Sequence, residues 1–209
     1  MKLTLVRVIV LAVLVIWLSA AVFPALATTY NVNITLPSFP LQSELKVFDV
    51  VEDPIPEWTQ VGSMQFGKLT LDFTNKIFRA NHYHVIDAIV RGNTQSNWSV
   101  TVENQTFDKL MSPGVSLGEH VVVQFCRAYM TGVGDETDDE PIIPAVAYSA
   151  CASRSFDKST YFLSGGWLRI YYGFATGQYP LQEGGAVPPG LADTQAGAYS
   201  GNVLVTFNL

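Results

Sequence analysis

Two histidines stand two residues apart in a segment with strong β character. Side chains alternate between the two faces of a strand, so His82 and His84 would share one face. With His120 they would supply three imidazoles, a set that can hold zinc. No carboxylate or cysteine lies at ligand spacing nearby, which favours two histidines on a sheet surface with His120 elsewhere. We therefore expect no metal and no other cofactor.

An acidic stretch is the second candidate for chemistry. Five carboxylates fall within six residues between Asp135 and Glu140, in a glycine-flanked segment. Hard oxygen ligands of this kind suit calcium. The spacing does not match an EF-hand, so a solvated acidic loop is the preferred interpretation, and calcium binding stays as the alternative.

The chain has two cysteines, Cys126 and Cys151. An even count in an exported chain favours one disulfide. Such a bond would close a loop of about 25 residues and add roughly 3 kcal/mol by restricting the unfolded chain. Two free thiols are the alternative. The pair lacks C-x-x-C spacing, and the chain has no G-x-S-x-G nucleophile motif, so the sequence predicts that the protein is not an enzyme.

Tryptophans and glycosylation patterns complete the candidate sites. Trp58, Trp98 and Trp167 could line a sugar-binding face, although such aromatics more often lie in the core or at the edge of a sandwich. Acceptor patterns for N-glycosylation begin at three asparagines, which matter only in a host that glycosylates. These are Asn33, Asn97 and Asn104.

The elements that must position these groups are strands with one apolar face. Alternation of apolar and polar residues recurs along the chain, separated by segments rich in proline, glycine and acidic residues. The expected loops are 52–60, 132–140 and 177–197. The expected strands are residues 30–36, 45–51, 66–73, 82–90, 98–102, 120–128, 145–152, 166–174 and 199–209.

This pattern predicts an all-β fold. Nine or ten strands with no convincing amphipathic helix indicate an antiparallel, immunoglobulin-like β-sandwich. We assign it to residues 41–209. An alternating apolar strand precedes it within residues 28–40 and is set off by Pro37 and Pro40. Such a detachable N-terminal strand either pairs within its own sheet or completes the sheet of a neighbour.

Residues 1–27 read as a secretory signal peptide. Lys2 and Arg7 precede a long apolar run, and Ala25-Leu26-Ala27 supplies small residues at a cleavage site. An uncut membrane anchor is the alternative, but the run is barely long enough to span a bilayer. We expect cleavage after Ala27 and an extracellular or cell-surface location.

Charge excludes some partners. The signal holds two of the twelve basic residues and none of the eighteen acidic ones, so residues 28–209 carry a net charge of −8. An acidic chain without a basic cluster is a poor ligand for nucleic acid or an anionic membrane. We expect membrane contact only during export.

Three segments resemble parts of secreted bacterial pilin-like subunits. Residues 196–207, AGAYSGNVLVTF, resemble the A-G-x-Y-x-G-x-V-x-V-T ending of the spore-coat-U-like, CFA-I-like and related families. Met64 to Leu69 is similar to the F-G-x-L that opens their sandwich. Residues 165–170 resemble their Gly-Gly turn before a late strand. The resemblance covers the last 45 or so residues, and the central position of both cysteines departs from chaperone–usher pilins.

The resemblance implies a structural subunit of a pilus-like or fimbria-like filament. Its partner would be another copy of the chain, joined by donor-strand complementation, and a secretion chaperone is a second candidate partner. The donor residues would be Tyr30, Val32, Ile34 and Leu36.

Two other functions remain open. A monomeric secreted module that binds carbohydrate or a surface would need an exposed aromatic platform. A secreted hydrolase would need the histidines or carboxylates to converge in one cleft.

Overall fold

The computed structural model describes residues 40–51, 57–72, 77–92, 96–132, 137–174 and 196–209. The chain divides into two compact units, residues 1–37 and Ser38–Leu209. The expected signal peptide and N-terminal strand, with Tyr30, Val32, Ile34 and Leu36, lie outside the described residues.

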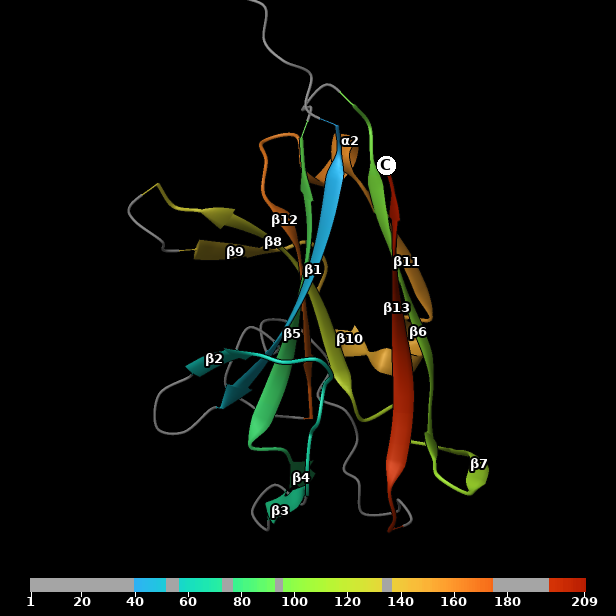
Figure 1. The fold of residues 1–209 in the computed structure, drawn as a ribbon. Coiled ribbons are helices and arrows are strands. Elements are labelled where there is room, and N and C mark those ends of the chain that lie inside the picture. The colour runs from blue at the N-terminus through green and yellow to red at the C-terminus, as the bar shows by residue number, and fades with distance from the viewer. Residues whose placement is uncertain (1–39, 52–56, 73–76, 93–95, 133–136, 175–195) are drawn as a thin grey trace, which may run out of the picture. The chain divides into compact units, whose positions relative to one another are not determined.

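The second unit contains two larger antiparallel sheets, as expected for an all-β sandwich (Figure 1). The first has seven strands in the order β10-β8-β12-β5-β1-β2, with β9 paired to β8. Its strands are β1 Gln42–Val51, β2 Glu57–Gln60, β5 His82–Arg91, β8 Val122–Met130, β9 Thr137–Pro141, β10 Val146–Ala147 and β12 Trp167–Gly173.

The second sheet has four strands in the order β11-β6-β13, with β7 paired to β6, and a separate hairpin joins β3 to β4. Two single-turn helices, η1 Tyr148–Ala150 and α2 Lys158–Tyr161, connect strands. The strands are β3 Thr70–Asp72, β4 Ile77–Arg79, β6 Ser99–Lys109, β7 Ser112–Ser116, β11 Ser153–Asp157 and β13 Tyr199–Asn208.

The main core lies between the two sheets. Side chains alternate between the two faces of each strand, so every second residue of a strand faces this core. Ile86, Ile170 and Phe125 from the large sheet meet Val100 and Val102 from β6 in one buried cluster. All five are almost completely buried. The alternation seen in the sequence is therefore what places these residues in the core.

A second cluster lies on the opposite face of the large sheet, which we call the outer face. Val50, Val85, Val122 and Tyr171 are buried there together with Cys126. Their neighbours along β5, β8 and β12 face the main core, so these three strands are apolar on both faces. A strand covered on both faces has this nearly continuous apolar sequence.

The expected disulfide is wrong. Cys126 and Cys151 are both buried free thiols. Cys126 belongs to the cluster on the outer face, whereas Cys151 belongs to the main core between the sheets. The two thiols therefore lie in different clusters, one on the outer face of the large sheet and one between the sheets.

Two expected loops contain strands, and two expected strands are shorter. Residues 57–60 form β2 and residues 137–141 form β9. In the segment 145–152, only Val146–Ala147 form a strand, β10, and the helix η1 follows it. Of the described residues in the segment 66–73, only Thr70–Asp72 form a strand, β3. Gly67 has a φ of +63°, a left-handed conformation that interrupts extended backbone and that glycine adopts without steric cost.

Among the described residues, no helix has the length and apolar character needed to cross a bilayer.

Candidate functional site

A buried charged cluster lies on the outer face of the large sheet. Its centre is Arg169 on β12, directly opposite Asp87 on β5 in the strand register. The guanidinium donates two hydrogen bonds to the carboxylate, Nε to Oδ1 at 2.7 Å and Nη2 to Oδ2 at 2.8 Å. This bidentate geometry is the strongest form of an arginine–carboxylate pair.

Asp139 on β9 adds a second carboxylate to the cluster. Its Oδ1 lies 3.0 Å from Arg169 Nη1, and its Oδ2 accepts a hydrogen bond from the Tyr171 hydroxyl. The side chains of Asp87, Asp139 and Arg169 are all at least nine-tenths buried. Burial acts to lower the pKa of Arg169, but the hydrogen bonds and charge of Asp87 outweigh it, so the pKa is raised and the guanidinium stays charged.

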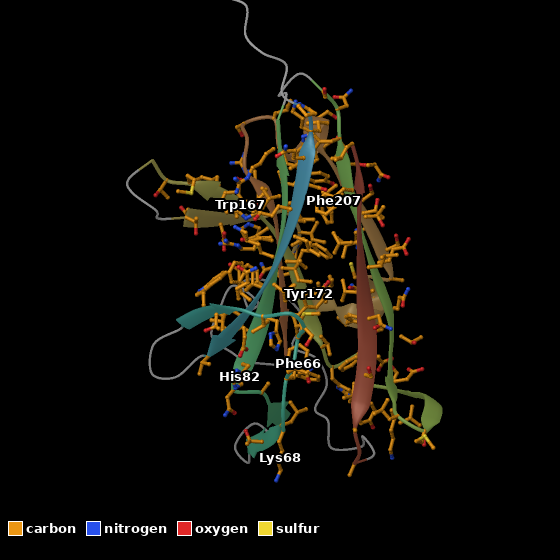
Figure 2. All side chains as sticks on the ribbon, viewed as in Figure 1. Phe66, Lys68, His82, Trp167, Tyr172 and Phe207 are labelled. Carbon is orange, nitrogen blue, oxygen red and sulfur yellow. The ribbon has the colours of Figure 1, made fainter. Side chains whose placement is uncertain are left out.

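Two tryptophans flank the same guanidinium. The Arg169 carbon Cζ lies 4.7 Å from the ring centroid of Trp58 and 5.5 Å from that of Trp167. Cation–π contacts of this kind stabilise a partly desolvated guanidinium. Figure 2 labels Trp167 on the side of the large sheet away from β13. The third tryptophan, Trp98, is buried and stacks on Phe162 with the ring centroids 5.1 Å apart.

The acidic stretch therefore contributes to the fold. Asp139 belongs to the buried cluster, and Glu140 pairs with Arg127 at 2.9 Å. Asp135 and Glu136 lie outside the described residues. The described part of the chain contains no group of three or more histidine, cysteine, aspartate or glutamate side chains placed to hold a metal ion.

His82 and His84 share the face of β5 that the sequence predicted, and Asp49 on β1 joins them. His82 Nδ1 lies 3.0 Å from Asp49 Oδ1, and His84 Nδ1 lies 3.6 Å from the same oxygen. His84 is 1% exposed, and its Nε2 accepts a hydrogen bond from the main-chain N–H of Gln65 at 3.1 Å. Burial lowers the pKa of His84 below 6.5, despite the opposing charge of Asp49.

One of the expected glycosylation sites is enclosed. Asn104 is buried on β6, where its Nδ2 donates to Cys151 O at 2.8 Å and its Oδ1 accepts from the Tyr172 hydroxyl at 3.0 Å. Its amide is engaged inside the core, so a glycan cannot be attached to it in the folded protein. Asn97 is exposed, and Asn33 lies outside the described residues.

The third candidate site is an incompletely covered side of the main core, which we call the open side. Partly exposed apolar residues of β1 and β13, the front strands of the two sheets in Figure 1, line it. Leu45 is 46% exposed although its register partner Ala88 is fully buried. Leu41, just before β1, also lines it, and the remaining lining residues are Leu45, Val47, Val203, Val205 and Phe207.

A difference in burial between paired residues of β6 and β13 defines the open side. Val205 and Phe207 on β13 lie directly opposite Val102 and Val100 on β6. The β6 valines are fully buried, whereas the β13 residues are only partly buried. Among the described strands, β13 pairs with β6 alone. The open side thus joins uncovered apolar surface to a strand with a single described partner.

The close approach of β13 to β6 depends on a glycine. An added Cβ at Gly201 would lie 2.2 Å from Cδ2 of Phe107 on β6. The strand register shifts between Gly201 and Val203, which marks a β-bulge. The glycine in the terminal motif therefore leaves room for the Phe107 side chain beside β13.

Sequence reasoning missed the charged cluster and the open side. The signals were present as Asp87 and Arg169 within otherwise apolar strands, since a charge buried in a strand needs a partner. In comparisons with protein-family models, curated proteins and solved structures, nothing matched this chain.

Proposed function

We propose that the chain is a structural subunit of an extracellular filament, in which each subunit completes the sandwich of a neighbour by strand addition. The observation that supports this most directly is the open side. Its apolar residues on β13 face the main core but remain partly exposed. A strand added along β13 would cover them and gain main-chain hydrogen bonds from the strand edge.

The segment of the chain with matching chemistry is the strand predicted at residues 30–36. Tyr30, Val32, Ile34 and Leu36 alternate with polar residues, so one face of the strand is apolar. In this proposal they insert into the open side of a second copy. The immunoglobulin-like arrangement, the detachable strand and the cell-surface location are parts of the same proposal.

The alternative of a monomeric carbohydrate- or surface-binding module finds less support. It requires an exposed aromatic platform. Trp58 and Trp167 instead flank Arg169, and Trp98 is buried in the main core. The three tryptophans therefore do not form one exposed platform.

The test changes one donor residue in the mature chain. Ile34→Asp places a charge on the apolar face of the donor strand, and Asn33→Asp places the same charge on its polar face as the matched control. We expect electron microscopy to show filaments for the wild type and for Asn33→Asp, and none for Ile34→Asp. Filaments formed equally by Ile34→Asp would overturn the proposal.

A second measurement is independent of the assembly conditions. A synthetic peptide of residues 28–37 is added to the Ile34→Asp chain, which retains its own open side. We expect slower amide hydrogen exchange along β13, because the new strand protects main-chain groups at its edge. A peptide that carries Ile34→Asp should protect nothing.

A further inference from the structure

The segment from Val61 to Leu69 is strand-like in its side-chain pattern but belongs to no strand. Met64 and Phe66 pack against the main core, whereas Ser63 and Gln65 between and beside them are exposed. Leu69 also packs on the core. The segment thus covers part of the core with alternating apolar side chains, as an added strand would.

Within the part of the chain that the structure describes, few main-chain hydrogen bonds hold this segment. Val61 N donates to Val47 O at 2.8 Å, and Gln65 N donates to His84 Nε2 at 3.1 Å. The segment joins no sheet within the described residues. Segments with few ladder hydrogen bonds and partly exposed contacts open at low free-energy cost.

The segment adjoins the open side at one end. It begins against Val47, which lines the open side on β1. In Figure 1 the chain after β2 then runs down toward the β3–β4 hairpin. Phe66 makes edge-to-face contacts with His84 and Phe174, with ring centroids 4.7 and 4.9 Å apart. Phe174 in turn lies 6.2 Å from Phe107 of the second sheet.

We propose that residues 61–69 form a displaceable plug on the open side, held in place by neutral His84 and released by acid. The inference rests on the proposed function, because a plug matters only if a strand enters. The geometry requires His84 Nε2 to be unprotonated, since only then can it accept the Gln65 N–H. Protonation converts this acceptor into a donor and removes the tether.

The groups that face His84 define the pH response. Asp49 on β1 is the nearest charge, His82 lies beyond it on β5, and Tyr172 is the register partner on β12. The pKa of Tyr172 is raised well above 10 by burial, so its phenol stays neutral. Burial lowers the pKa of His84 and outweighs the charge of Asp49 and the main-chain groups of Gln65 and Phe48, which act to raise it.

The direction of the effect follows from that lowered pKa. A released His84 titrates near 6.5, whereas a plugged His84 holds its proton less tightly. The plug is therefore fully stabilised above pH 6.5. Its stability decreases as the pH falls below 6.5 toward the lowered pKa of the buried imidazole.

The first test follows the plug itself, without any added strand. Exchange of the Gln65 amide is measured by NMR in the Ile34→Asp chain at pH 7.5 and pH 5. After correction for the intrinsic pH dependence of exchange, we expect protection at pH 7.5 and its loss at pH 5. His84→Gln retains an acceptor that does not titrate, so its protection should not change with pH. Equal protection of the histidine chain at both pH values would overturn the acid release.

The second test measures access to the open side. Phe66→Ala removes the main anchor of the plug, and Lys68→Ala is the control, because Lys68 is exposed and extends away at the lower end of Figure 2. We expect Phe66→Ala to bind the peptide of residues 28–37 about tenfold more tightly. This gain corresponds to an unplugged state that is populated at about one part in ten in the parent chain and becomes dominant in the variant. Lys68→Ala should match the parent chain.

The outcomes separate the plug from the proposed function. Peptide binding that is equal in the parent and in Phe66→Ala rejects the plug but leaves strand addition intact. If the peptide binds none of the chains, Phe66→Ala included, strand addition is rejected. A Gln65 amide that exchanges freely at pH 7.5 rejects the plug whatever the peptide does.

Discussion

The outer face of β12 and the open side beside β13 differ in how completely their side chains are paired or covered. On the outer face, Arg169 is buried with two carboxylates and two aromatic rings around it. On the open side, Val205 and Phe207 remain partly exposed although they face the core. The first region is closed by its own chain, whereas the second still has apolar surface to cover.

The difference shows which region is available to a partner. A buried charge must be paired within the fold, because an unpaired one costs several kcal/mol. Uncovered apolar surface costs less in the free subunit and is recovered when another strand covers it, at about 25 cal/mol per Å². We therefore assign stability of the subunit to the outer face and association to the open side.

The largest effect should come from breaking the charged cluster. Arg169→Leu leaves Asp87 and Asp139 buried without their cation, and we expect a loss of about 3–5 kcal/mol in the free energy of unfolding. Urea denaturation followed by tryptophan fluorescence measures it. Arg91→Leu is the matched control, because Arg91 pairs with Glu44 at an exposed position and should change stability by less than about 0.5 kcal/mol.

A loss below about 1 kcal/mol for Arg169→Leu would contradict this assignment. It would mean that the two carboxylates find other partners or become protonated at little cost.

The second prediction compares two residues that lie directly opposite each other. Val102→Ala removes fully buried methyl groups, and we expect a loss of about 2 kcal/mol in the monomer. Val205→Ala removes partly exposed methyl groups and should cost less than about 1 kcal/mol there. Equal losses measured by urea denaturation would show that Val205 on the open side is as well covered as Val102 in the main core.

Local pattern predicted the strands but not what joins them. Residues 82–90 and 166–174 are rich in branched and aromatic residues, and both segments form strands, β5 and β12. The pairing of Asp87 with Arg169 depends on the register between these strands, which are about 80 residues apart in sequence. Register is set by packing of the whole sheet, so a local pattern cannot supply it.

The acidic stretch shows the same limit. Asp138 to Glu140 resembles a solvated loop because all three residues are charged. In the structure β9 pairs with β8, which brings Asp139 to Arg169 and Glu140 to Arg127. The arginines that convert this stretch into a strand come from other parts of the chain. The disulfide expectation failed for a related reason, since cysteine count carries no information about which face of a sheet each thiol occupies.

A third prediction concerns a buried polar group on the outer face of the large sheet. Gln124 on β8 is fully buried opposite Tyr171, and neither polar atom of its amide has a hydrogen-bond partner among the described residues. Gln124→Met keeps the volume and removes the desolvated amide, so we expect the free energy of unfolding to rise by about 1 kcal/mol. Thermal denaturation of the two chains measures this. A decrease would show that a bound molecule satisfies the amide in solution.

The smallest effect should come from reductant. Because Cys126 and Cys151 lie in separate clusters, a reducing agent should leave the urea midpoint unchanged, whereas a shift would reveal a disulfide in solution. Burial and the charge of Asp139 raise the pKa of Cys126 to about 12, which keeps its reactive thiolate scarce. We expect an alkylating reagent to label neither thiol in the folded chain and both in urea. If Cys126 were labelled in the folded chain as fast as in urea, the outer face would open as readily as the side beside β13, and the contrast between the two regions would be wrong.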